Sequence, residues 1–466
     1  MIKFGTSGWR AIMGEEFTFA NVRRVVQAIA NYLKGQNPGK NISVVVGYDT
    51  RFLSERFAKE AAVLLSRNKI QVCLAERDCP SQALAYQIIR GGHSGGINFT
   101  ASFNPPEFNG LKFNVSSGAP ALPEVTDRIE LEVEKISPEE VSPHYYPDTR
   151  YICRSNFQSD YLEFLQGKID FESIRKAKIK VGIDLLFGTS REYLDEILEE
   201  NGIPIEVIHG YIDPYFGGIS PSCTEKNLTE LKSLVKERGC ALGLATDADG
   251  DRFGILDEKG RLVIPNYVLA LLLEYLLTVK GWRGGVGRSV TTTHLIDRIA
   301  RSYDLPIYRT PVGFKYMADL FLRGKIIFGG EESACLAIKD HLPEKDGIFA
   351  GLLVAEMIAV YGQNLSELLK QLFKKYGRMF VTQENVPLTP DKAKRLRELI
   401  KNPPDFLIKK KVLSVETMDG LKLNFSEDNW LILRFSGTEP VIRCYSEAET
   451  EKEARALLKA GLELLC

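Results

Sequence analysis

Three aspartates at alternate positions, followed at once by an arginine, form the most informative segment of the chain. Residues 247–252 read Asp-Ala-Asp-Gly-Asp-Arg, and carboxylate oxygens are the ligands that Mg²⁺ prefers. Without a cation, three carboxylates this close together would repel one another and any phosphorylated ligand. The apolar runs on either side, 241–245 and 253–256, predict buried strands. The segment therefore predicts a divalent metal site, facing a phosphate, in a turn between two strands, although aspartate and glycine are also common in solvated turns.

A calcium loop is the alternative interpretation of the same carboxylates. Asp247, Asp249 and Asp251 match positions 1, 3 and 5 of the EF-hand pattern, and Glu258 falls at position 12. However, Arg252 stands where that pattern needs a turn glycine, and the flanks predict strands where an EF-hand has helices. We therefore expect a magnesium site.

A serine follows another apolar run and could exchange a phosphoryl group. Residues 100–105 read Thr-Ala-Ser-Phe-Asn-Pro, directly after the run 95–99. A hydroxyl in the turn that leaves a strand can be directed at a ligand, and phosphorylated Ser102 would carry a dianion that suits the predicted cation. Taken alone, the Ser-x-Asn-Pro pattern is also typical of an ordinary turn.

The segment 433–440, Leu-Arg-Phe-Ser-Gly-Thr-Glu-Pro, has the composition of a phosphate cradle. Hydroxyls and a compact glycine backbone donate hydrogen bonds to phosphate oxygens, and arginines clamp them. A hairpin turn with surface arginines remains the alternative. The residues expected to bind here are Arg434, Ser436, Gly437, Thr438 and Arg443.

A fourth segment, 329–335, reads Gly-Gly-Glu-Glu-Ser-Ala-Cys after the apolar run 326–328. In an extended backbone, Glu331 and Ser333 point to the same side, where they could bind vicinal sugar hydroxyls. The same residues would also suit a capping turn. This motif alone does not separate the two interpretations.

The elements that must position these segments alternate between short apolar runs and amphipathic helical patterns. Examples are the runs 42–47, 70–74 and 179–183, and the helical patterns 55–67 and 81–90. Such alternation predicts α/β units with ligand loops at the strand ends. The last part differs, because a helix at 391–400 precedes hairpin-like runs and a closing helix at 452–465. We expect three related mixed-sheet α/β domains and a smaller C-terminal α+β domain around one central cleft.

Composition limits the classes of partner. The chain has 466 residues and a formal net charge of −1, with 44% hydrophobic and 26% charged residues. This balance is typical of a globular protein and favours neither nucleic acid nor a membrane as a partner. Eight cysteines without a Cys-x-x-Cys pair, five dispersed histidines and the lack of an N-terminal apolar signal predict a cytoplasmic protein. The sequence leaves the oligomeric state unknown.

Taken together, the four motifs resemble the α-D-phosphohexomutase superfamily, and the resemblance spans the whole chain. They occur in the family's order, one in each of four domains. The opening Gly-Thr-Ser-Gly-Trp-Arg at 5–10 is similar to the family's N-terminal loop. The resemblance implies a phosphoserine-loop domain (1–145), a metal-binding domain (146–256), a sugar-recognition domain (257–375) and a phosphate-binding domain (376–466).

Within the superfamily, the segments 310–315, 330–333 and 345–347 most resemble the phosphoglucomutase and phosphomannomutase branch. The phosphoglucosamine branch more often has Glu-Gln-Ser in its sugar loop. Five positions depart from the family pattern. Phe103, Phe314 and Cys335 stand where members often have histidine, and Trp9 and Ala11 replace the usual leucine and glycine of the first loop. Phenylalanine can neither carry a proton nor donate a hydrogen bond, so the departures bear on proton transfer and sugar selectivity more than on phosphoryl transfer.

The implied reaction is reversible transfer of a phosphoryl group between the 1- and 6-positions of glucose or mannose. It passes through phosphorylated Ser102 and a hexose 1,6-bisphosphate, which also primes the enzyme, with Mg²⁺ as the metal. A lysine at position 112 is expected to act as acid and base, with its pKa lowered by neighbouring cations. The implied site residues are Ser102, Asp247, Asp249 and Asp251 for the metal, Ser102, Lys112, Arg10 and Arg252 for catalysis, and Arg288, Gly313, Glu331, Ser333, Arg434, Ser436, Gly437, Thr438 and Arg443 for the substrate.

Three alternatives remain open from the sequence. Phosphoglucosamine mutase is a neighbouring activity. A metal-dependent phosphatase could use Ser102 as its nucleophile, and a paralogue could retain the fold without turnover. We also expect a hinge near Tyr376 that closes the last domain and excludes water.

Overall fold

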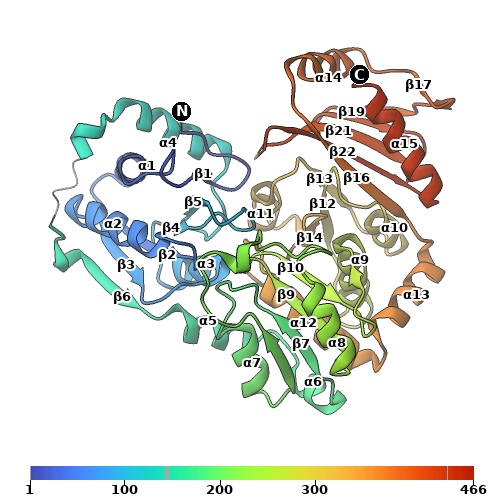
Figure 1. Cartoon of the computed structure of the whole chain (residues 1–466), viewed down its shortest axis with the longest axis horizontal. Helices are drawn as coiled ribbons and strands as arrows, with labels where there is room; N and C mark the ends of the chain where they lie inside the picture. Colours follow the sequence, from blue (N-terminus) through green and yellow to red (C-terminus); the bar gives the residue numbers. More distant parts are fainter. Residues whose placement is uncertain (1, 142–145, 438, 466) are drawn as a thin grey trace.

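The computed structural model describes residues 2–141, 146–437 and 439–465. Three mixed-sheet α/β domains are followed by a C-terminal domain with an antiparallel sheet, and Figure 1 shows them in chain order from blue to red. The predicted fold class is confirmed. Two predictions concern residues outside the described ranges: the phosphate contact of Thr438 and the end of the first domain at residue 145.

The first domain contains a six-stranded sheet in the order β1-β5-β4-β2-β3-β6. Strands β4, β2, β3 and β6 run parallel, and β5 and β1 are added antiparallel. The last strand, β6, follows the predicted domain limit and still pairs in this sheet. The elements are β1 (Trp9–Ile12), α1 (Phe19–Gln36), β2 (Ser43–Tyr48), α2 (Ser54–Arg67), β3 (Gln71–Ala75), α3 (Ser81–Arg90), β4 (Gly95–Phe99), β5 (Phe108–Val115), α4 (Pro123–Lys135), η1 (Pro138–Val141), η2 (Thr149–Tyr151) and β6 (Ile152–Ser155).

The second domain has a five-stranded sheet in the order β11-β10-β9-β7-β8. Its parallel part is β9-β7-β8, and β10 and β11 continue it antiparallel. The elements are α5 (Phe157–Gln166), α6 (Phe171–Ala177), β7 (Val181–Asp184), α7 (Leu194–Glu200), β8 (Ile205–Ile208), η3 (Phe216–Gly218), α8 (Thr229–Glu237), β9 (Leu242–Thr246), β10 (Phe253–Leu256) and β11 (Leu262–Val263).

The third domain has a four-stranded sheet in the order β13-β12-β14-β15, of which only β15 is antiparallel to its neighbour. Two apolar helices, α9 and α12, are buried over most of their length. The elements are α9 (Pro265–Thr278), β12 (Gly285–Ser289), α10 (Leu295–Ser302), β13 (Ile307–Thr310), α11 (Phe314–Leu322), β14 (Ile326–Glu331), β15 (Cys335–Ile338), α12 (Gly347–Tyr361) and α13 (Leu365–Tyr376).

The three sheets share one feature that positions the functional loops. Each has a parallel strand that turns back into an antiparallel neighbour, namely β4 into β5, β9 into β10 and β14 into β15. Ser102 lies in the first of these turns, the segment 247–252 in the second and the segment 332–334, directly after Glu331, in the third. The three motifs therefore occupy equivalent places in three related domains.

The fourth domain is a five-stranded antiparallel sheet in the order β16-β22-β21-β20-β19. Helix α15 packs against β22, β16 and β21, and the described residues 436, 437, 439 and 440 of the phosphate-cradle segment lie between β21 and β22. The elements are β16 (Phe380–Pro387), α14 (Pro390–Lys401), β17 (Phe406–Leu407), β18 (Lys410–Lys411), β19 (Ser414–Glu416), β20 (Leu421–Asn424), β21 (Trp430–Phe435), β22 (Val441–Ala448) and α15 (Glu451–Glu463).

The two largest hydrophobic clusters lie in different parts of the molecule. One continuous cluster runs through the first three domains, from Trp9 to Met379, and a separate cluster fills the fourth domain. The fourth domain is joined to the third by a small apolar cluster of Val290, Trp430, Ile432 and Tyr445 and by polar contacts around Glu447, which is fully buried. Its carboxylate accepts hydrogen bonds from Thr293 Oγ1, from the backbone N–H of His294 (2.8 Å) and from Trp430 Nε1 (2.7 Å). Burial raises the pKa of Glu447 to about 7.

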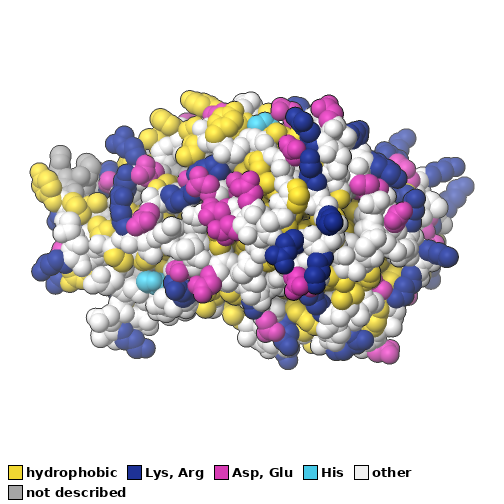
Figure 2. Space-filling model, turned by 90° about the horizontal axis from the view of Figure 1, so that it is seen from below, with side chains coloured by type: hydrophobic (Ala, Val, Ile, Leu, Met, Phe, Trp, Pro, Cys, Tyr) yellow, Lys and Arg dark blue, Asp and Glu magenta, His cyan; other side chains and the backbone are white. Residues whose placement is uncertain are grey.

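Basic and acidic side chains are interspersed over the face of the molecule shown in Figure 2. In the described ranges, no single helix is long and apolar enough to cross a membrane. The helices α12 and α13 pass that test only as a pair, and they are bent by 81°.

Candidate active site

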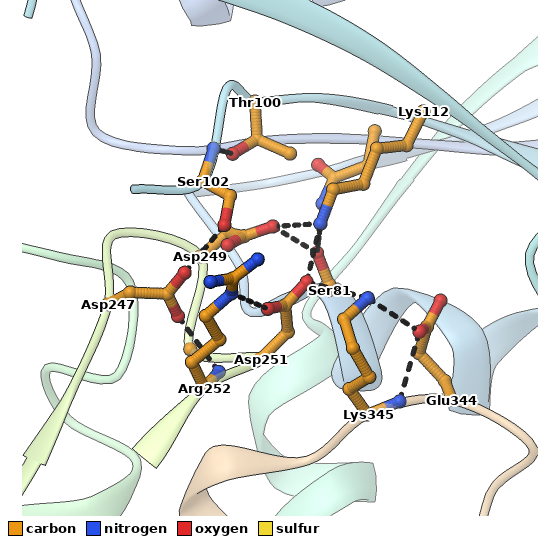
Figure 3. A network of polar contacts seen from close by, with 12 residues as sticks. Ser81, Thr100, Ser102, Lys112, Asp247, Asp249, Asp251, Arg252, Glu344 and Lys345 are labelled. Atoms are coloured by element: carbon orange, nitrogen blue, oxygen red, sulfur yellow. Dashed lines mark hydrogen bonds and ion pairs between the residues drawn. The ribbon is translucent and has the colours of Figure 1, made fainter. Parts of the chain in front are cut away.

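The structure brings Ser102 to the acidic segment, although 145 residues separate them in the chain (Figure 3). Ser102 Oγ donates a hydrogen bond of 2.6 Å to Asp247 Oδ2, and both side chains are buried. The backbone of Ser102 has a φ of 52°, in the left-handed region that L residues rarely adopt. Strained backbone of this kind often occurs at functional sites. The turn between β4 and β5 thus places a hydroxyl beside the three carboxylates.

The three aspartates fit a divalent cation. One carboxylate oxygen from each of Asp247, Asp249 and Asp251 lies within 4.8 Å of the others. The Oδ1 atoms of Asp249 and Asp251 are buried and have no hydrogen-bond partner among the described residues. Buried carboxylate oxygens normally have a partner, so these two atoms are suited to an ion. Burial and the charges of Asp251 and Asp249 raise the pKa of Asp247, and a divalent cation would oppose this shift.

Two buried lysines compensate the charge of the aspartates in this structure. Lys112 Nζ lies 2.5 Å from Asp249 Oδ2 and 2.6 Å from Asp251 Oδ2, and Lys345 Nζ lies 3.0 Å from Asp251 Oδ2. Burial alone would lower the pKa of Lys112, but the charges of Asp249 and Asp251 outweigh burial and raise it. The expectation of a lowered pKa for Lys112 was therefore wrong in this geometry, because its nearest neighbours are anions.

Arg51 fixes the backbone of the serine loop, and its role was missed from the sequence. Its guanidinium is buried and pairs with Asp49 at 3.1 Å. The same group donates to the carbonyl oxygens of Ser102 (2.5 Å), Asn104 (2.6 Å), Pro105 (2.7 Å) and Phe108 (3.1 Å). The only available signal was an arginine shortly after the end of a predicted strand, which is too common to identify a scaffold residue.

A cavity of about 400 Å³ lies next to this centre and is lined by all four domains. Ser102 is not among its described lining residues, whereas Phe103, Arg10 and Arg252 are. The described lining contains no histidine, in keeping with the three positions where this chain replaces a histidine of the family pattern. The lining residues from the predicted site are Arg10, Arg252, Glu331, Ser333, Arg434, Ser436, Gly437 and Arg443.

The turn between β14 and β15 brings two carboxylates to the cavity. Glu331 is buried and accepts a hydrogen bond of 2.7 Å from the backbone N–H of Gly313. Burial and the charge of Glu332 raise the pKa of Glu331 to about 7. Ser333 lies next to Cys335, with 3.4 Å between hydroxyl and thiol. Glu331 and Ser333 thus line the cavity, and Gly313 holds Glu331 in place without lining it.

The phosphate-cradle segment forms another wall. Arg434 Nε pairs with Asp419 at 3.0 Å, and Arg443 Nε donates to Ser436 Oγ at 3.3 Å. A Cβ atom added at Gly437 would lie 2.7 Å from Thr6 Oγ1. The first and fourth domains therefore meet at this point, and the close approach depends on glycine.

Arg288 is not brought to the cavity. Its side chain is 1% exposed, and its guanidinium forms a bidentate pair with Asp297 at 2.5 and 2.7 Å. The predicted substrate contact is therefore absent from this structure, because a carboxylate on α10 occupies the charged group. A single arginine in a strand pattern does not reveal which neighbour it will pair with.

Family comparisons agree with this architecture. The chain matches models described as phosphoglucomutase/phosphomannomutase alpha/beta/alpha domain I over residues 1–140, domain II over 159–260 and domain III over 264–376. The corresponding C-terminal domain matches residues 385–463. The chain therefore belongs to the phosphoglucomutase/phosphomannomutase family of the α-D-phosphohexomutase superfamily.

Individual relatives agree on the class of reaction and differ in the sugar. A phosphoglucomutase/phosphomannomutase of Thermococcus kodakarensis is 31% identical over 99% of this chain and 98% of its own. A phosphoglucosamine mutase of Methanocaldococcus jannaschii is 29% identical over 99% and 98%. The crystal structure of a protein assigned as a phosphomannomutase, from Thermus thermophilus, has a TM-score of 0.86 at 30% identity and covers 100% of this chain and 99% of its own. The chain is thus a phosphohexomutase-type isomerase.

Proposed function

We propose that the protein transfers a phosphoryl group reversibly between the 1- and 6-positions of glucose or mannose, through phosphorylated Ser102 and a hexose 1,6-bisphosphate. The observation that carries this proposal is the 2.6 Å contact between Ser102 Oγ and Asp247 within a carboxylate cluster suited to a cation. A serine that only received a regulatory phosphate would not need buried metal ligands beside it.

Phosphoryl transfer passes through a loose transition state, so positioning and charge neutralisation do most of the work. In the proposed site, Asp247, Asp249, Asp251 and the phosphorylated serine would hold Mg²⁺, and a bound Mg²⁺ would supply charge neutralisation. Arg51 fixes the loop that presents the hydroxyl. Phospho-Ser102 gives its phosphoryl group to the free hydroxyl of the sugar phosphate, and the reoriented bisphosphate returns its other phosphoryl group to the serine.

Lys112 is proposed to carry the proton in each transfer. Its contacts with Asp249 and Asp251 place an ammonium group at the reacting centre. No histidine lines the described cavity, which supports a lysine in this role. A bound cation would compete with Lys112 for these carboxylates and free its ammonium group for the substrate.

The wall formed by Arg434, Ser436, Gly437 and Arg443 is proposed to bind the phosphate that does not react, with Thr438 beside it in the sequence. Because one anion site must serve both isomers, Ser436→Ala should weaken glucose 1-phosphate and glucose 6-phosphate to a similar degree. Glu331 and Ser333, which line the same cavity, are proposed to contact sugar hydroxyls and to distinguish epimers.

Intact-mass analysis combined with a coupled assay tests the proposal. The purified wild type should carry one phosphoryl group that the Ser102→Ala variant lacks. With magnesium and a trace of glucose 1,6-bisphosphate, glucose 1-phosphate or mannose 1-phosphate should be converted into the 6-phosphate. Release of free phosphate without isomer formation would identify a phosphatase, and phosphorylation without either product would identify a paralogue that has lost turnover.

Glucosamine 1-phosphate is the second candidate substrate. It is favoured by relatives such as the phosphoglucosamine mutase of Methanocaldococcus jannaschii, which is 29% identical to this chain. The sugar loop argues against it, because Glu332 replaces the glutamine typical of that branch. The same assay with glucosamine 1-phosphate decides between them through the ratio of kcat/KM values. We propose a cytoplasmic location, in keeping with seven described cysteines that are all free thiols.

A further inference from the structure

The ring of Phe103 contacts two arginines at the cavity wall. The Cζ atom of Arg252 lies 4.0 Å from the ring centroid, and that of Arg10 lies 5.3 Å from it. All three side chains line the cavity, and Phe103 directly follows Ser102 in the serine loop. One aromatic ring from the first domain therefore joins a guanidinium of its own domain to one from the second domain.

The two arginines have few other fixed contacts. Arg10 Nη1 donates to Asn104 Oδ1 at 2.7 Å, and Arg252 Nε is 3.9 Å from Asp251 Oδ1. The Nε atoms of both arginines are buried and have no hydrogen-bond partner among the described residues. Buried guanidinium donors normally have partners. Both arginines line the cavity, and guanidinium groups bind phosphoryl oxygens strongly.

The two guanidiniums that face this ring carry like charges. Burial, followed by the like charge of Arg252, lowers the pKa of Arg10 to about 10, although nearby aspartates oppose this. The face of an aromatic ring carries negative potential and attracts a cation. It supplies this attraction without an acceptor that would occupy the guanidinium donors. An aliphatic side chain would fill the space without the attraction, and a protonated histidine would add a third positive charge.

We propose that Phe103 is a positioning residue that holds Arg10 and Arg252 together as a clamp for the phosphoryl group moving between Ser102 and the sugar. The identification of the moving group rests on the proposed function. In this chain, the position that often carries a proton-transferring histidine in the family serves to orient two cations. Proton transfer is then left to other groups of the site.

Replacement of Phe103 by 3,4,5-trifluorophenylalanine is the most direct test. Fluorination preserves the shape of the ring and removes most of its negative potential. Phe103→Leu removes the ring, and Phe103→Tyr is the matched control that retains it. Two contacts worth about 0.5–1 kcal/mol each predict roughly a tenfold weaker affinity for inorganic phosphate in the trifluoro and leucine variants, measured by calorimetry with magnesium present. The tyrosine variant should stay within about threefold of the wild type.

Two further measurements separate this proposal from its alternatives. The trifluoro variant should unfold at the wild-type temperature, which shows that packing is intact, and its kcat with glucose 1-phosphate should fall roughly tenfold. Wild-type phosphate affinity in the trifluoro variant would overturn the clamp, whatever the leucine variant does, because apolar packing alone would then account for Phe103. If the wild type isomerises no hexose phosphate, the proposed function fails, while the phosphate-binding series still tests the clamp.

Discussion

Replacing Arg51 by methionine should destabilise the protein and disorder the serine loop at the same time. Asp49 would lose the partner of a fully buried charge, which costs about 3–5 kcal/mol. Four backbone carbonyls would lose their donor, at roughly 1 kcal/mol each, and water can replace part of this. Since methionine also avoids the cost of burying a guanidinium, we expect a net loss of about 4 kcal/mol in the free energy of unfolding.

Urea denaturation of the Arg51→Met variant measures this loss. The double variant Asp49→Asn/Arg51→Met is the control, and it should regain roughly 2–3 kcal/mol because no buried charge is left without a partner. Burial already raises the pKa of Asp49 in the wild type. In the single variant, the loss should therefore shrink as the pH falls and Asp49 becomes neutral.

The same variants test the link between the loop and catalysis. Ser102 holds a left-handed φ of 52°, a conformation that costs about 1–2 kcal/mol and relaxes once the carbonyl contacts are lost. Phosphorylation of Ser102 by glucose 1,6-bisphosphate, followed by intact mass, should slow by on the order of 10²-fold in both variants. If Arg51→Met stays within about 1 kcal/mol of wild-type stability and is phosphorylated at the wild-type rate, Arg51 does not hold the serine loop in place.

Three further predictions concern other contacts. Lys112→Met leaves Asp249 with no lysine partner, so the free energy of unfolding of the metal-free variant, measured by urea denaturation, should fall by about 3 kcal/mol. Magnesium should restore most of this loss. A loss that magnesium leaves unchanged would contradict the charge argument. Because the pKa of Glu447 is raised to about 7, its contribution to stability is complete below pH ~4.5 and is lost as the pH rises through 7. The difference in free energy of unfolding between the wild type and Glu447→Gln should therefore fall by roughly 3 kcal/mol between pH ~4 and ~9. A difference that stays constant with pH would exclude the raised pKa. Gly437→Ala places a methyl group 2.7 Å from Thr6 Oγ1, so the KM for glucose 1-phosphate should rise about tenfold. The double variant Gly437→Ala/Thr6→Gly removes the clash and should restore the wild-type KM. An unchanged KM in Gly437→Ala would show that the close approach is dispensable.

The sequence predicted those parts of the fold that depend on local pattern. The strands around the segment 247–252 and the turn after 95–99 could be recognised because apolar runs end there in polar residues. The long helix α1 was not predicted. The short antiparallel strands β1 and β15 were missed as well. Strand β1 pairs with β5, about a hundred residues away in the chain, whereas β15 pairs with the strand directly before it and has only four residues to carry a pattern.

The candidate site was predictable where a motif names its ligand chemistry and unpredictable where a long side chain chooses a partner. Ser102 and the aspartates carry recognisable spacing, and the structure brings them together. Arg288 instead pairs with Asp297, and Arg51 donates hydrogen bonds to four carbonyl oxygens of the serine loop. A flexible cation can reach several anions or carbonyls, so its partner is set by tertiary packing alone.

The separation of the two hydrophobic cores has a consequence for how this enzyme could diversify. The serine, the aspartates and both counterion lysines belong to the large folded body, whereas the cradle around Arg434 belongs to a body with its own interior. Mutations that reshape the cradle without touching the buried junction around Glu447 therefore need not disturb the reactive centre. New preferences for the anchored end of a substrate could accumulate in the last ninety or so residues while the chemistry stays intact.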